Sequence, residues 1–360
     1  MLKQNFEIIL AFFASLTISL ILIPSLKLIA HHMGLIDRPN ARKVHQNPIP
    51  VIGGLVIGIS LIMSLLVNSY LLEAVSSYFT IISASLLLMF VGILDDRLNL
   101  KAHHRLIIQL CCAYAIAASG IRLTSLYGVF GINELNVYVS YALTIFIITG
   151  VINAFNLIDG IDGLAGFLSL LGFSIFSYLL YIMGHYTLLI ILMSLTGGIV
   201  GFLKYNLSAK KIFLGDGGSL LLGSLLVSSG VQIVELSSTN VHLDVNHSIT
   251  IVFGIFLIPV FDSLRVYWGR MQRGFSPFRA DKSHLHHLLI FFRISHKKAS
   301  SIIALSTLAL IIISFSFQTI GLNGSIIAVS LIFILLTGIL SAIKNLLEWK
   351  NKIKKLENRD

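Results

Sequence analysis

Carboxylate and carboxamide side chains gather in one short stretch of the chain, between two long apolar runs. This stretch, residues 153–165, contains Asn153, Asn156, Asp159 and Asp162, and a glycine follows each aspartate. Such oxygen ligands suit Mg²⁺, which typically binds one or two carboxylates together with substrate phosphates. Polar groups at membrane depth are costly and usually functional. The stretch therefore predicts half of a metal-assisted phosphate site, in which the i,i+3 spacing places both aspartates on one helix face.

Two further acidic clusters lie beside apolar runs. Asp95 and Asp96 are adjacent and must be offset by a cation or a shared proton; Arg105 nearby could bind an anion. Asp216 lies among glycines in residues 213–219, just before a span, where backbone amides and a carboxylate together suit a phosphate with a divalent cation. The competing interpretations are a solvated helix end for the first cluster and a glycine-rich cap with Asp216 as N-cap for the second.

A basic loop carries three histidines in four residues, His284, His286 and His287, shortly after Arg279. The loop lacks the cysteines of a structural zinc site. Phosphate binding by histidine and arginine is therefore favoured over metal binding.

No pattern in the sequence assigns a role to the other titratable residues described next. Asp262 lies three residues before Arg265 inside an apolar run, so the two can simply pair with each other. Neither a Walker A sequence nor a dinucleotide fingerprint is present. Six histidines have no supporting context: His31, His32, His185, His242, His247 and His296.

The elements that must position these groups are membrane helices. Of the 360 residues, 56% are hydrophobic and only 12% are charged, which is more apolar sequence than a soluble core requires. A span needs about 20 apolar residues. We therefore expect an all-α polytopic membrane protein with about eleven spans, near residues 6–29, 51–68, 74–94, 104–121, 136–155, 164–183, 187–204, 217–235, 248–269, 299–318 and 324–344.

The basic residues fall almost entirely on one face of this eleven-span arrangement. They occupy the loops 30–50, 95–105, 204–216 and 270–298 and the C-terminal tail, whereas the opposite face holds only Lys3 and Arg122. By the positive-inside rule the basic face is cytoplasmic, which places the N-terminus outside and the C-terminus in the cytoplasm. All four clusters lie on this cytoplasmic face. The net charge of +10 thus reflects topology and does not indicate nucleic-acid binding.

The domain organisation is expected to be simple. Residues 1–345 should form a single transmembrane catalytic domain. Residues 346–360 should form a basic cytoplasmic tail lying on anionic lipid.

The four clusters, in this order and at span ends of one face, resemble the polyprenyl-phosphate N-acetylhexosamine-1-phosphate transferases. The run from Asp37 to His45, which includes Lys43, also looks like the first cytoplasmic loop of that family. Ser-Pro-Phe followed by Asp-x-x-His-x-His-His looks most like the WecA branch, which uses UDP-GlcNAc. The chain departs from common family residues at three positions: Asn99, His103 and Gly217.

The resemblance implies transfer of N-acetylglucosamine-1-phosphate from UDP-GlcNAc to undecaprenyl phosphate, with release of UMP. It implies Mg²⁺ bound by Asp216 and Asn156, with Mn²⁺ as an alternative ion, and a lipid phosphate oriented or deprotonated by Asp95 or Asp96. The expected catalytic residues are Asp95, Asp96, Asp159 and Asp162. The expected substrate-binding residues are Asn153, Arg279, His284, His286, His287, Lys43 and Arg105.

The expected location is the bacterial inner membrane, where the product would start a lipid-linked cell-surface polysaccharide such as an O-antigen. Three alternatives stay open: another UDP-N-acetylhexosamine, UDP-MurNAc-pentapeptide, or an ion-coupled transporter. A transporter site should lie near the bilayer midplane, whereas these ligands cluster at one face. The expected partners are the nucleotide sugar, the lipid phosphate and the bilayer but no nucleic acid, with a homodimer among the oligomeric states open to the chain.

Overall fold

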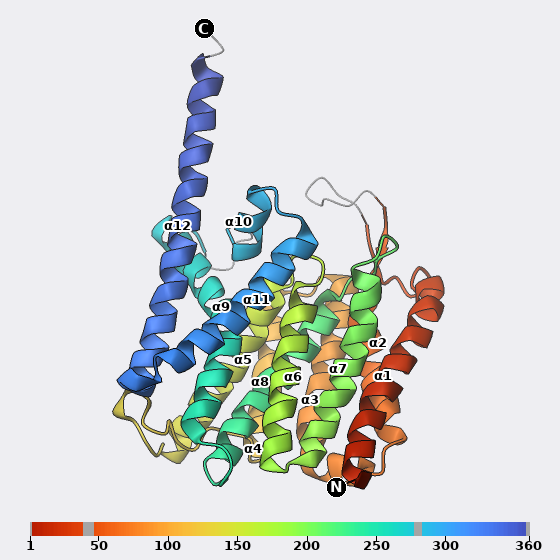
Figure 1. Cartoon of the computed structure of the whole chain (residues 1–360). Helices are drawn as coiled ribbons and strands as arrows, with labels where there is room; N and C mark the ends of the chain where they lie inside the picture. Colours follow the sequence, from red (N-terminus) through yellow and green to blue (C-terminus); the bar gives the residue numbers. More distant parts are fainter. Residues whose placement is uncertain (1, 39–46, 277–282, 358–360) are drawn as a thin grey trace.

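The computed structural model describes residues 2–38, 47–276 and 283–357, and these are almost entirely helical (Figure 1). The α-helices are α1 (Leu2–Ile29), α2 (Gly53–Leu66), α3 (Leu71–Leu98), α4 (Ala102–Ala118), α5 (Val137–Ile158), α6 (Leu164–Met183), α7 (Tyr186–Asn206), α8 (Gly215–Ser237), α9 (Val245–Gln272), α10 (Leu285–Phe291), α11 (His296–Ser316) and α12 (Gly321–Glu357). Two short 3₁₀ turns are η1 (Val129–Gly131) and η2 (Gln318–Ile320), and two antiparallel strands are β1 (Ile36–Asp37) and β2 (Ile49–Pro50).

The predicted all-α polytopic membrane fold is confirmed, since each of the eleven expected spans overlaps one helix. Within the described ranges, nine helices are long and apolar enough to cross a membrane. The other two, α2 and α4, have 14 and 17 residues. The short helix α10 was not expected, because seven residues within a basic loop carry no span-like pattern.

The helices run side by side, and α1 begins at the opposite end of the bundle from the last turns of α12 (Figure 1). Two helices start with a side-chain cap: Asn136 accepts from the Tyr138 amide at the start of α5, and Asp244 accepts from the Asn246 amide at the start of α9. Helix α12 is continuous to Glu357, so the expected tail from residue 346 onward extends the last helix (Figure 1). Its contact with lipid stays a prediction.

Helix α8 is the centre of the bundle and packs against α2, α3, α5, α6 and α9. It is rich in glycine and serine, and most of its residues are buried. Small residues let helix backbones approach closely in a membrane, where apolar burial alone does not favour helix pairing.

One glycine shows how close the approach is. A Cβ added to Gly92 of α3 would lie 2.5 Å from the Asp216 carbonyl oxygen of α8. The end of α3 is thereby held against the start of α8.

Candidate active site

Two acidic clusters meet where α3 ends and α8 begins. Asp95 is 8% exposed, accepts a hydrogen bond from the Leu100 amide at 2.6 Å, and pairs with Arg105 at the start of α4. The same guanidinium nitrogen of Arg105 lies 2.9 Å from Oδ2 of Asp216. Arg105 is therefore the cation that offsets both carboxylates. A solvated helix end does not describe Asp95, which is buried and bonded.

Asp96 binds the first turn of α8. Its carboxylate accepts hydrogen bonds from the backbone amides of Asp216 at 3.1 Å and Gly217 at 3.4 Å. These amides are among the unpaired donors of a helix start. The N-cap of α8 is Leu214, without a side-chain cap, so the interpretation of Asp216 as the N-cap is wrong. The Asp216 carboxylate faces Arg105 instead.

Asn156 lies beside this acidic group. It is in the last turn of α5, because that helix runs three residues beyond the expected span end at 155. Its Nδ2 donates to Oγ of Ser219 at 3.0 Å, and that hydroxyl donates to the Asp216 carbonyl at 3.2 Å. Asn156 and Asp216, the two expected metal ligands, are thus joined through one serine.

Asn153, one turn earlier in α5, makes bonds within the protein. Its Nδ2 donates to Oε1 of Gln109 at 2.7 Å and to the Thr149 carbonyl at 2.8 Å. Gln109 of α4 is 2% exposed. Sequence reasoning missed Gln109, although a glutamine inside an apolar run was a signal that could have found it.

The prediction that Asp159 and Asp162 share a helix face is wrong. Helix α5 ends at Ile158, residues 159–163 form a turn, and Gly163 has a φ of +82° that a helix does not use. Asp159 is partly buried, and this burial together with the charges of Asp96 and Asp162 raises its pKa to about 7.

Asp162 connects three parts of the chain. Its Oδ2 lies 2.8 Å from Nζ of Lys211 and 3.3 Å from Nδ1 of His296, and its carbonyl accepts from the Ser300 hydroxyl at 2.7 Å. Burial by itself would raise the pKa of the Asp162 carboxyl, but the hydrogen bonds from His296 and Lys211 hold it below its ordinary value. The sequence analysis gives His296 no partner, and no local pattern signals this contact with Asp162.

Two of the three clustered histidines are buried. His284 is 5% exposed, and its Nδ1 lies 2.9 Å from Oδ2 of Asp262 in α9. The expected pairing of Asp262 with Arg265 is confirmed at 2.7 Å, but His284 shares that carboxylate. The ring of His286 is parallel to that of His284, and their centroids are 5.8 Å apart. His287 is half-buried, and its ring centroid lies 4.2 Å from that of His286.

His286 lies directly against the turn that follows α5. A Cβ added to Gly160 would lie 2.8 Å from Cε1 of His286 and closer still to Nε2. Burial, followed by the neighbouring His287 and His284, lowers the pKa of His286 to about 3, so this ring is neutral at physiological pH. The histidine helix α10 and the 159–163 turn thus form one surface.

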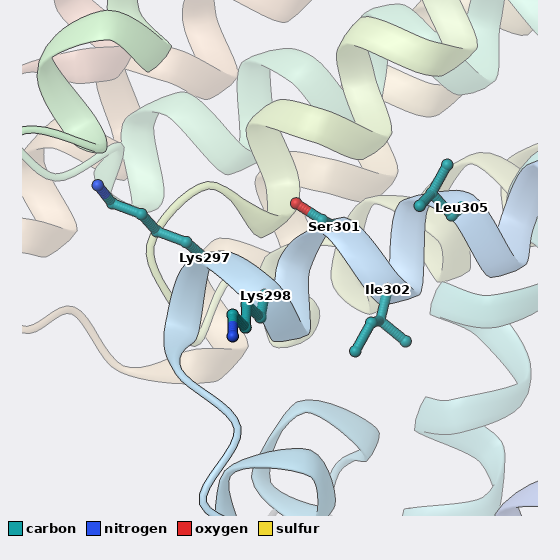
Figure 2. A pocket seen from close by; sticks show the side chains of 5 residues that line it. All are labelled: Lys297, Lys298, Ser301, Ile302 and Leu305. Carbon is teal, nitrogen blue, oxygen red and sulfur yellow. The ribbon is translucent and has the colours of Figure 1, made fainter.

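Two expected substrate-binding residues, Lys43 and Arg279, lie outside the described residues. A shallow pocket of about 340 Å³ lies along one face of α11 and is lined by Lys297, Lys298, Ser301, Ile302 and Leu305 (Figure 2). None of the expected site residues that the structure describes lines this pocket. These described residues lie instead at or near helix ends.

The four clusters predicted separately are therefore brought together at one end of the bundle. They combine carboxylates, carboxamides, neutral imidazole and the guanidinium of Arg105, which are the positioning and charge-stabilising groups that phosphoryl transfer needs. A site at helix ends differs from the midplane site of a transporter.

Comparison with known proteins gives the same result. The model of glycosyl transferase family 4 matches residues 78–234. A probable undecaprenyl-phosphate N-acetylglucosaminyl 1-phosphate transferase of Bacillus subtilis is 33% identical over 93% of this chain and 90% of its own length. The undecaprenyl-phosphate alpha-N-acetylglucosaminyl 1-phosphate transferase of Escherichia coli is 31% identical over 77% of this chain and 75% of its own length. The Yersinia pestis protein of the same name is 29% identical over 79% of this chain and 77% of its own length. The chain thus belongs to the polyprenyl-phosphate N-acetylhexosamine-1-phosphate transferases of glycosyl transferase family 4.

Proposed function

We propose that this protein transfers N-acetylglucosamine-1-phosphate from UDP-GlcNAc to undecaprenyl phosphate. The observation that carries the proposal is the bridge from Arg105 to both Asp95 and Asp216, with Asn156 joined to Asp216 through Ser219. This bridge brings anionic ligands and cationic or neutral hydrogen-bond donors together where α3 ends and α8 begins. The names of the relatives from Bacillus subtilis and Escherichia coli support this choice of sugar and lipid.

In the proposed reaction an oxygen of the lipid phosphate attacks the sugar-linked phosphorus of UDP-GlcNAc. The bond from that phosphorus to the bridging oxygen breaks, UMP leaves with that oxygen, and GlcNAc-diphospho-undecaprenol forms. A phosphate monoester is largely ionised at neutral pH, since its second pKa is about 6. A general base is therefore not required. In this reaction Asp95 would hold Arg105 in place. Asp96 would hold the start of α8, where the phosphates must be aligned.

The residues present fit Mg²⁺, with Mn²⁺ as an alternative ion. Over the described part of the chain no group of three or more His, Cys, Asp or Glu side chains is arranged so that it could hold a metal ion by itself. Mg²⁺ does not need such a group, because it is usually bound by one or two carboxylates together with substrate phosphates. We assign the ion to Asp216 and Asn156. When bound, it supplies charge stabilisation to the phosphate oxygens of the diphosphate.

The remaining groups would hold the nucleotide sugar. Asp159 lies on the turn that His286 contacts at Gly160, so Asp159 and the α10 histidines would contact the same part of the diphosphate. The pairing of Asp162 with Lys211 and His296 suits it to keeping this turn in place. The basic loops share this end of the bundle, so we place the site at the cytoplasmic face of the bacterial inner membrane.

The test uses purified protein in detergent or liposomes with undecaprenyl phosphate and a panel of radiolabelled UDP-sugars. Labelled lipid and an equal amount of UMP should appear with UDP-GlcNAc. Transfer from another UDP-N-acetylhexosamine or from UDP-MurNAc-pentapeptide alone would overturn the sugar assignment. The absence of labelled lipid with every donor would overturn the reaction.

A further inference from the structure

Asp262 is a buried carboxylate that the proposed reaction does not use. It lies in α9 and is 1% exposed. Its two oxygens accept hydrogen bonds from the Leu285 amide at 3.0 and 3.1 Å, while Arg265 and His284 bind one oxygen each. Isolating a carboxylate in a protein interior is costly unless it is fully paired. Three of these four interactions link Asp262 to the start of α10.

Arg265 strengthens the same connection. The nitrogen that pairs with Asp262 also donates to the Ser283 carbonyl at 2.7 Å. Three consecutive residues, Ser283 to Leu285, are therefore bonded to this pair of α9 side chains. A mutual ion pair within α9 would require none of these contacts with α10.

The hydrogen bond to Asp262 also determines which ring nitrogen of His284 carries a proton. An ionised carboxylate only accepts hydrogen bonds, so Nδ1 of His284 must carry the proton that faces Asp262. With its ring fixed in this way, His284 lies parallel to His286 at 5.8 Å. His286 is 2% exposed, and its Nδ1 has no hydrogen-bond partner in the described part of the protein. Ring packing against His284 and Gly160 is thus what orients His286.

We propose that Asp262 is a positioning residue, which fixes the start of α10 and the ring of His284 so that His286 faces the 159–163 turn. The consequence for binding of the nucleotide sugar rests on the proposed function. The effect on the positions of the histidines does not. Asp262 acts through its neighbours and contacts no reacting atom.

The experiment compares Asp262→Asn with Ser341→Ala in the full-length protein. Asn keeps the size of the side chain but removes its charge and one of the two acceptor oxygens. Ser341 bonds to the other terminal nitrogen of Arg265 at 3.4 Å, so its removal leaves the Asp262 contacts intact. The exposed His103 and His104 serve as internal references. Each histidine is modified with diethyl pyrocarbonate and followed by mass spectrometry without substrate, and initial rates are measured separately against UDP-GlcNAc and undecaprenyl phosphate.

In Asp262→Asn we expect modification of His284 and His286 to accelerate about tenfold, because the charge-assisted hydrogen bond that fixes His284 is lost and the ring packing that orients His286 loosens with it. The KM for UDP-GlcNAc should rise about tenfold, with the KM for the lipid within about twofold of wild type. Ser341→Ala should match wild type in every measurement. Unchanged modification in folded Asp262→Asn, or a fall in kcat with both KM values unchanged, would overturn the proposal.

Two further outcomes are distinguishable. If Asp262→Asn does not fold, the double variant Asp262→Asn/Arg265→Gln also removes the unpaired cation and is judged by the same criteria. If histidine modification accelerates but wild-type protein uses no UDP-GlcNAc, the proposed function fails and the positioning role of Asp262 stands.

Discussion

Replacing Gly160 by alanine tests the contact between the 159–163 turn and the histidine helix. The new Cβ would meet the ring of His286 at 2.8 Å or less, whereas normal carbon contacts are roughly 3.5 Å or longer. The backbone of Gly160 is not in the left-handed region, so alanine itself is conformationally acceptable there. The predicted effect is therefore purely a displacement of about 1 Å between the turn and the ring.

His286 has little room to retreat, since it is 2% exposed and packed against His284 and His287. Overpacking of this kind costs about 1–3 kcal/mol in stability. A misplacement of about 1 Å in a positioned site reduces catalysis by roughly 100-fold. We therefore expect kcat/KM for UDP-GlcNAc to fall by about 100-fold in Gly160→Ala while the protein stays folded.

The assay is transfer of radiolabelled N-acetylglucosamine-1-phosphate to undecaprenyl phosphate, with gel filtration and thermal melting as tests of folding. The matched control is Gly150→Ala, in the interior of α5, where an added Cβ meets nothing within 4 Å. This control should keep wild-type transfer, and its stability should be unchanged or higher by up to about 1 kcal/mol. Transfer by folded Gly160→Ala within about twofold of wild type would refute the contact as a determinant of activity.

Three further predictions concern charged groups of the site. Asp216→Asn should lower transfer by roughly a thousandfold with no loss of folded protein, since a metal ligand is removed; near-normal turnover would contradict that role. Complete chelation of divalent cations should stop transfer, and added Mg²⁺ should restore it; activity that survives chelation would count against metal dependence. Lys211→Met should lower stability by about 1 kcal/mol above pH 4, because the pKa of Asp162 is depressed in the folded protein. This deficit should shrink as the pH falls below about 4 and Asp162 becomes protonated; a deficit independent of pH would exclude the ion pair as its cause.

The sequence predicts the spans well because a membrane helix needs a long apolar run, and such runs are visible locally. The sequence predicts the ends of these helices less accurately. Asn153 and Asn156 belong to α5, since that helix continues to Ile158, and Asp159 and Asp162 are separated by the turn that follows. A few residues at the end of a span thus change which side chains share a face.

Hydropathy and charge in the sequence alone determined the all-α membrane fold, and the residue types and their order determined the four clusters and the family they resemble. Only the tertiary structure decided which groups pair: Arg105 with Asp95 and Asp216, His296 with Asp162, and Asp262 with His284. Two of these pairs, Arg105 with Asp216 and His296 with Asp162, join segments far apart in the chain. Contact within each pair depends on how the helices are rotated and packed against one another, and no local pattern of residues encodes that geometry.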